Sequence, residues 1–191
     1  VWSPVQQFQV IKQITLILGR MIEQSVSEAV GRPIQIAYEY SDDLKAAGAV
    51  TVLYCGVATR AGSRDREYEF ADGGERFRNP PLVMRAQYAV SAWAKAPDDQ
   101  DLLGAVLRTF LDRPFIQPEG MEEEQIIGYA GLPSVDMEPL SFDDHRALAE
   151  AFSIPLAPTM RYWVDFRVQS SKTTPIKRVQ ERVMDFRKIE G

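Results

Sequence analysis

The sequence predicts an α+β fold in which a mixed, mostly antiparallel sheet packs against helices. Two segments, 82–93 and 160–169, alternate apolar and polar residues, which is the pattern of a half-buried strand. Two others, 4–30 and 98–111, carry apolar residues three and four positions apart, as amphipathic helices do. Long strands mixed with helices in this way favour the α+β class.

The first predicted helix begins after Ser3, an N-cap residue that is followed by proline, and ends at Gly31. Gly19 lies inside this helix and is a point where it can bend. Strands are predicted over 34–40 and 50–59, because both segments are rich in β-branched and aromatic residues.

Two polar segments connect the following elements. Residues 42–48 are predicted to be a connection, and residues 60–79 a charged loop with a brief strand at Tyr68 and Phe70. The acidic and basic residues of this loop balance. A protein interface or a salt-bridged loop is therefore favoured over a phosphate-binding site.

The strand over 82–93 is the most regular element. Because proline has no backbone N–H to donate, Pro80 and Pro81 are expected to mark where its pairing begins. Every second residue from Leu82 is apolar and is predicted to build the core. The opposite face, expected to be partly solvated or to contact a neighbour, carries Arg85, Gln87 and Trp93.

The second half of the domain repeats these patterns. The helix over 98–111 has three aspartates at its start, where the helix dipole favours them, and Pro114 ends it. A short edge strand is predicted over 134–140, and a helix capped by Ser141 runs to about Phe152. The last strand, over 160–169, again has one apolar and one polar face.

Length and charge divide the chain into an α+β domain, 1–170, and a basic C-terminal arm, 171–191. Residues 172–191 hold six Lys or Arg and three Asp or Glu, so the arm carries +3 and the remainder −8 of the net −5. This balance argues against nucleic-acid binding and predicts that the arm docks on an acidic partner or neighbouring copy. Its conformation stays open, since its apolar residues fit both a helix and an extended strand.

No residue pattern indicates a cofactor, a metal or a catalytic site. His145 is the only histidine, and its neighbours Asp143 and Asp144 point in different directions on a helix, which makes a poor chelate. The single cysteine, Cys55, lies in an apolar strand, where an inert thiol is expected, and it fits a reducing compartment such as the cytosol. The sequence predicts no phosphate-binding glycine motif, no signal peptide and no membrane-spanning helix.

Five short motifs occur in a recognisable order over about residues 5–170. They are Val52-Leu53-Tyr54, Arg78-Asn79-Pro80-Pro81-Leu82, Leu102-Leu103-Gly104, Pro114, and Pro158 followed by Tyr162 and Val164. Their order and spacing resemble those of the cap proteins of extracellular contractile injection systems, tail-terminator-like proteins related to the Photorhabdus virulence cassette and antifeeding prophage caps. The sequence departs from the family pattern at Val90–Trp93 and around 147–152, which bears on interface residues more than on the fold.

The resemblance implies a tail-terminator-like fold and a structural, non-enzymatic role. It implies a homo-hexameric ring at the distal end of a contractile tail, which ends polymerisation of the inner tube and sheath and joins the two. The implied partners are further copies of the chain and the sheath and inner-tube subunits, with no direct membrane insertion. Assembly is expected in the bacterial cytoplasm, within a particle that is later released or membrane-associated.

An interface is expected to use the exposed arginines, the tryptophans on polar strand faces and the basic arm, because aromatic and arginine side chains anchor such contacts. The predicted residues are Arg76, Arg78, Arg85, Gln87, Trp93, Trp163, Lys177, Arg178, Arg182, Val183, Phe186 and Arg187.

Two alternatives stay open. One is an adaptor elsewhere in the same particle, such as a baseplate subunit. The other is a small-molecule-binding or catalytic α+β domain with Trp93 and Trp163 lining an aromatic cleft, although the sequence offers no converging polar groups for it.

Overall fold

A five-stranded sheet organises the part of the chain that the computed structural model describes, residues 10–59, 69–71, 76–78, 82–116, 132–168 and 173–175. The elements are, in chain order, α2 (Val10–Val30), β1 (Ile36–Ala37), α3 (Leu44–Ala47), β2 (Ala49–Thr59), β3 (Glu69–Ala71), β4 (Arg76–Arg78), β5 (Leu82–Trp93), α4 (Asp98–Asp112), β6 (Ser134–Glu138), α5 (Phe142–Phe152), β7 (Thr159–Val168) and β8 (Thr173–Pro175).

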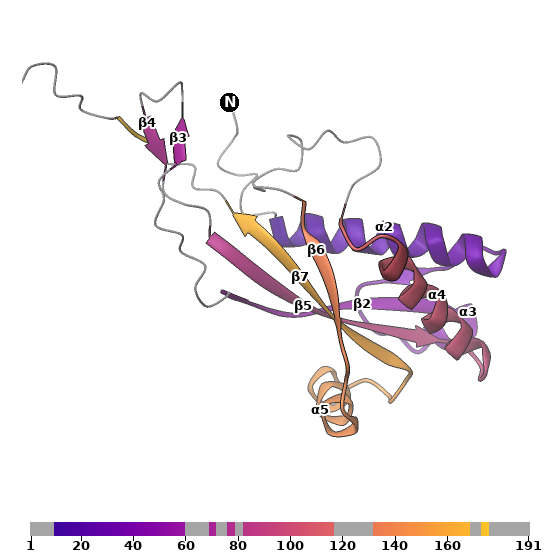
Figure 1. The fold of residues 1–191 in the computed structure, drawn as a ribbon. Helices are drawn as coiled ribbons and strands as arrows, with labels where there is room; N and C mark the ends of the chain where they lie inside the picture. Colours follow the sequence, from indigo (N-terminus) through magenta and orange to yellow (C-terminus); the bar gives the residue numbers. More distant parts are fainter. Residues whose placement is uncertain are drawn as a thin grey trace, which may run out of the picture.

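The strand order in the large sheet is β1-β2-β5-β7-β6, and a second, small sheet has the order β3-β4-β8. β1 and β2 run parallel, whereas every other pair is antiparallel. Helices α2 and α4 cover one face of the large sheet, and α5 lies on the other side (Figure 1). The predicted α+β class, with a mixed and mostly antiparallel sheet, is therefore confirmed.

The main core lies between the large sheet and helices α2 and α4. The apolar faces of β5 and β7 meet in register, so that Ala86 pairs with Val164 and Tyr88 with Tyr162, all of them buried. The Tyr88 hydroxyl lies 3.1 Å from the Thr15 hydroxyl of α2, which gives this buried polar group a partner. Burial raises the pKa of Tyr88 to about 12, so the side chain is neutral in the folded protein at ordinary pH.

A second, smaller core lies on the opposite face of the sheet and contains Trp93. This tryptophan is only 4% exposed and packs with Leu44 and Ala49. Its ring centre lies 4.7 Å from that of Tyr40, and its Nε1 donates a 3.0 Å hydrogen bond to Thr51. The expectation that Trp93 is exposed on a solvated or partnered face is therefore wrong, because residues 37–49 and 154–157 fold over that end of the strand.

Several predicted elements are confirmed with small changes in their bounds. The strand predicted over 34–40 is reduced to β1, and the polar connection over 42–48 contains the short helix α3. The charged loop contains β3 near the predicted brief strand and also β4, which was not predicted. The Ser141 cap is confirmed, since its hydroxyl accepts a 3.1 Å hydrogen bond from the Asp144 amide. The predicted Ser3 cap lies outside the described residues.

Gly19 does not interrupt α2, which is continuous from Val10 to Val30. Its role is steric. A Cβ added at Gly19 would lie 2.2 Å from the hydroxyl oxygen of Tyr38, which packs across the helix at this point. The glycine therefore admits an aromatic ring at the cost of its poor helix propensity.

We predict that Gly19→Ala raises the free energy of unfolding by less than Gly104→Ala does, because displacing the Tyr38 side chain offsets the gain in helix propensity of about 1 kcal/mol. Urea unfolding of the two proteins measures the difference.

Gly104→Ala is the matched control. Gly104 lies inside α4, and a Cβ added there meets no atom within 4 Å. This substitution is expected to raise the free energy of unfolding by about 0.5–1 kcal/mol. Equal gains from both substitutions would show that Tyr38 does not constrain Gly19.

Candidate functional site

The face of β5, β7 and β6 that points away from α2 and α4 carries a connected set of ion pairs. Arg85 on β5 donates two hydrogen bonds to Asp165 on β7, from Nε at 2.6 Å and from Nη2 at 2.8 Å. This is the fork geometry in which arginine binds a carboxylate most strongly. Its Nη2 also lies 3.8 Å from Asp136 on the edge strand β6, so one guanidinium links three neighbouring strands.

Trp163 lies within this set of charges. The Arg85 guanidinium lies over the indole, 5.5 Å from the ring centre, which is a cation–π distance. The indole N–H donates to the Glu138 carboxylate on β6. Arg161 continues the set, with Nη1 at 3.3 Å from Glu138 and Nη2 at 3.1 Å from Asp144 at the start of α5. We call these residues the polar sheet face: Arg85, Asp136, Glu138, Asp144, Arg161, Trp163 and Asp165.

The pKa shifts of Arg85 and Asp144 favour the ionised forms of these two side chains. The hydrogen bond that Arg85 donates to Asp165 raises the pKa of Arg85, against a smaller opposing effect of burial. The pKa of Asp144 is lowered first by the hydrogen bond from Ser141 and then by Arg161. Both shifts stabilise the ionised forms, so these groups are suited to hold a geometry or a charged partner rather than to transfer protons near neutral pH.

The structure brings together three of the predicted interface residues. Arg85 and Trp163 belong to the polar sheet face, and Gln87 lies beside them because it pairs with Trp163 in the ladder. Trp93 lies apart from them in the small core. Arg76 and Arg78 occupy β4, of which the backbone is described. The six predicted arm residues lie outside the described residues: Lys177, Arg178, Arg182, Val183, Phe186 and Arg187.

The acidic partners of the polar sheet face were not predicted as site residues. The alternation in the sequence places Arg161 and Asp165 on the polar face of their strand, but it gives no information on which side chains of other strands they meet. Arg85 and Asp165 are 80 positions apart, and only the register of β5 against β7 makes them neighbours.

The pairing of β5 with β7 continues into the small sheet. Leu82 pairs with Val168 at the end of the large-sheet ladder, and Arg78 pairs with Thr173 where pairing resumes. Between these two pairs, three positions intervene on the β5 side, 79–81, and four on the β7 side, 169–172. The register of the small sheet is therefore shifted by one residue relative to that of β5 and β7. The small sheet lies beyond the ends of β5 and β7 (Figure 1). Within the described residues, the outer edges of β3 and β8 pair with no further strand.

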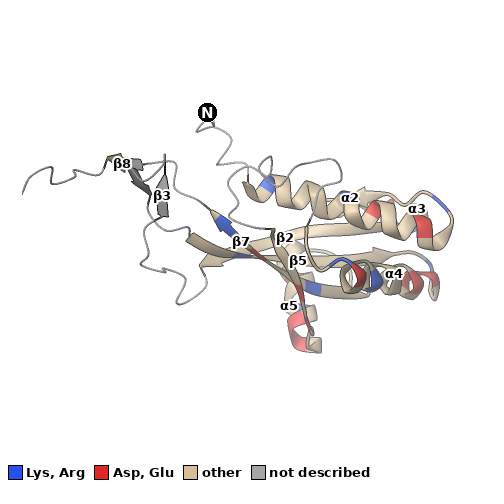
Figure 2. Ribbon diagram, turned by 45° about the horizontal axis from the view of Figure 1, so that its top comes forward, with Lys and Arg blue, Asp and Glu red and all other residues tan. Residues whose placement is uncertain are grey.

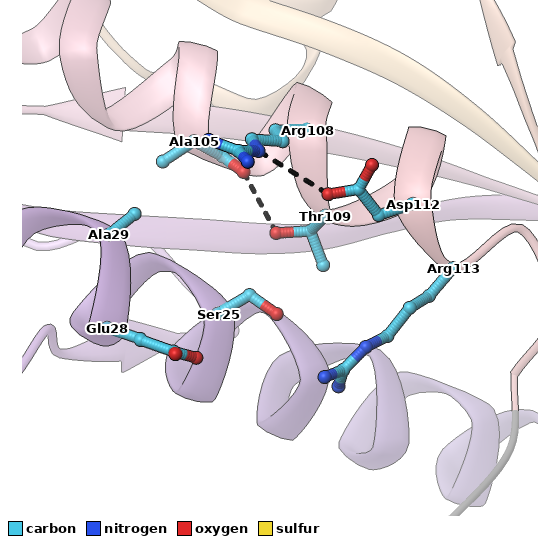
Figure 3. Close-up of a pocket in the computed structure, with 8 residues that line it drawn as sticks. All are labelled: Ser25, Glu28, Ala29, Ala105, Arg108, Thr109, Asp112 and Arg113. Atoms are coloured by element: carbon cyan, nitrogen blue, oxygen red, sulfur yellow. Dashed lines mark hydrogen bonds and ion pairs between the residues drawn. The ribbon is translucent and has the colours of Figure 1, made fainter.

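A pocket of about 290 Å³ lies between α2 and α4, on the opposite layer from the polar sheet face (Figure 3). Its lining residues are Ser25, Glu28, Ala29, Ala105, Arg108, Thr109, Asp112 and Arg113. The acidic and basic residues balance, Arg108 pairs with Asp112 at 3.4 Å, and the Thr109 hydroxyl donates to the Ala105 carbonyl. Neither Trp93 nor Trp163 lines the pocket, so it does not form the aromatic cleft of the alternative hypothesis.

Other chemistry-bearing residues offer little. No group of three or more His, Cys, Asp or Glu side chains within the described residues is placed to hold a metal ion. Cys55 is half-buried, and desolvation raises the pKa of its thiol, which disfavours the nucleophilic thiolate. None of the described helices is long and apolar enough to cross a membrane.

We predict that Arg85→Met lowers the free energy of unfolding by about 1–3 kcal/mol, because it leaves the mostly buried Asp165 carboxylate without its bidentate partner. The Asp165 side chain is 11% exposed, and that of Arg85 is 32% exposed. Urea unfolding at neutral pH measures the change, and Arg85→Met combined with Asp165→Leu is expected to recover most of the loss.

Arg108→Met is the control for this prediction. It removes an ion pair of the same type, but its side chains are 80% and 66% exposed, so a change below about 0.5 kcal/mol is expected. If Arg85→Met costs no more than Arg108→Met, the polar sheet face is not a structural network.

Comparison with known proteins identifies a family with a similar sequence and fold. Residues 13–181 match the family described as the Pvc16 N-terminal domain. No curated protein matches the sequence.

Two solved structures share the fold. One is described as the sheath/tube terminator of an extracellular contractile injection system, PVC, in its extended state, with 13% identity and a TM-score of 0.63 over 92% of this chain. The other is described as the tube-terminating cap of the anti-feeding prophage, with 16% identity and a TM-score of 0.67 over 91% of this chain. The chain spans 65% and 60% of the lengths of these two proteins. With the family match extending over most of its length, the chain belongs to the Pvc16 N-terminal domain family.

Proposed function

We propose that this chain is a structural cap of a contractile injection system, which ends polymerisation of the inner tube and sheath and joins the two. The observation that carries the proposal is the shared fold, over more than nine-tenths of this chain, with a sheath/tube terminator and a tube-terminating cap. The role is non-enzymatic, and the particle is extracellular after assembly in the bacterial cytoplasm.

In the proposed mechanism, the cap stops growth because the two sides of its ring present different surfaces. A stacked tube grows because each ring presents the surface that the next ring binds. A terminator matches that surface on one side and lacks it on the other. In a closed ring, here of six copies, each protomer uses two different surfaces, one for each neighbour.

The polar sheet face and the small sheet are the surfaces that we assign to these contacts. Arg85, Gln87 and Trp163 are only partly buried within the protomer, and the small sheet offers edges to which a neighbouring strand can add. In the proposed assembly, Arg76, Arg78 and the arm residues extend these contacts to sheath subunits or the next copy. Trp93 contributes only to folding.

The proposal predicts that particles assembled without this chain have inner tubes and sheaths of uncontrolled length. The length distribution in electron micrographs, with and without the chain, measures this. Supplying the intact chain is expected to restore a narrow distribution.

Unchanged tube lengths in particles that lack the chain would contradict the cap function. Loss of the baseplate, with tubes absent altogether, would contradict it as well and would favour an adaptor at the other end of the particle.

A further inference from the structure

Helix α5 is packed against the protomer far less than α2 or α4. Of its 11 residues only Ala149 is buried, although a helix on a folded domain normally buries a whole apolar stripe. Phe142 at its start is 71% exposed and Phe152 at its end 39% exposed. Leu156, in the segment that leads to β7, is 55% exposed. Three large apolar side chains around α5 therefore lack full cover within the protomer.

The region around α5 is acidic. Residues 134–156, from β6 through α5, hold five Asp or Glu and one Arg, a net charge of −4. Arg161 of β7 pairs with two of these acids, Glu138 and Asp144, and brings the local net charge to −3. Figure 2 shows acidic positions in red on α5. Within the described residues, the Asp143 side chain makes no ion pair, whereas Asp144 pairs with Arg161 and Glu150 with Arg146. A partner for this surface must combine apolar side chains with positive charge.

One segment of the chain has this combination. Residues 176–191 hold five Lys or Arg and three Asp or Glu, a net charge of +2. Four of their apolar residues recur three and four positions apart, which would place them on one side of a helix. They are Ile176, Val179, Val183 and Phe186.

The geometry disfavours docking of this segment on its own protomer. The start of α5 lies at Arg161, which pairs with Asp144. Val168, at the end of β7, is seven positions after Arg161, so these two residues lie about 23 Å apart at 3.3 Å per residue. Pro175 lies beyond that end, since it pairs with Arg76 of β4. Val179 follows Pro175 by four residues and can lie at most about 14 Å away. As a helix, the segment from Pro175 to Phe186 rises only about 17 Å at 1.5 Å per residue, so its apolar positions do not reach the α5 of the same copy.

We infer that the surface formed by Phe142, Phe152 and Leu156, with the acidic residues of α5 beside it, binds residues 176–191 of a second copy of this chain. The inference rests on the proposed function, because it adds α5 to the surfaces through which neighbouring copies in the ring would meet. The apolar residues of the arm would cover the exposed aromatic side chains, and its basic residues would lie along the acidic helix.

Photo-cross-linking in the full-length chain tests the inference. A photoreactive phenylalanine, benzoylphenylalanine, replaces Phe142, and equal amounts of unlabelled and 15N-labelled protein are mixed before irradiation. Mass spectrometry is expected to find cross-links from position 142 to peptides within 176–191, in pairs that join a labelled and an unlabelled copy. Lys177→Glu with Arg178→Glu is expected to reduce their yield several-fold.

The same reagent at Leu111 is the control, because this α4 side chain is equally exposed, at 70%, on the opposite layer. It is expected to give no cross-link to the arm. Arm cross-links confined to one copy, equal yields from positions 142 and 111, or no arm cross-link at all would overturn the inference. If tube lengths depend on the chain in any of these cases, the cap function stands and only this docking site fails.

Discussion

The antiparallel register between β5 and β7 is the constraint on which the rest of the structure depends. It pairs every residue from Leu82 to Ser91 with a partner between Val168 and Thr159. Because side chains alternate along a strand, this single register sends Tyr88 and Tyr162 into the core and Arg85 and Asp165 to the opposite face. A shift of one residue would bury the charges and expose the tyrosines, so the core and the polar sheet face stabilise the same register.

The two ends of this ladder have different environments. At the Ser91 end, the second face is closed by the small core around Trp93, where the Ser91 and Thr159 hydroxyls lie 2.8 Å apart. At the Leu82 end, that face remains polar and partly exposed, and pairing continues into β4 and β8. The second face is therefore buried at one end, while the other end presents charged side chains and, within the described residues, unpaired strand edges of the kind used in assembly.

Alternation and helical spacing sufficed to predict the α+β class and the core faces of β5 and β7, because these patterns are local. Trp93 shows the limit of that reasoning. It lies on the face that the sequence marks as polar, but Tyr40 and Ile154 cover it from distant parts of the chain. The ion pair of Arg85 with Asp165 likewise depends on register rather than on local pattern. Short elements such as α3 and β4 have too few residues to produce a periodic signal.

Three surfaces that a lone protomer leaves incompletely covered would link the stable core to the capping role: the polar sheet face, the edges of the small sheet and α5. The most direct measurement is a cryo-electron microscopy reconstruction of the intact injection particle with this chain located in the density. We expect a single ring of this chain at the distal end of the tube, in contact with both tube and sheath. Density for the chain at the baseplate, or repeated along the shaft, would contradict it.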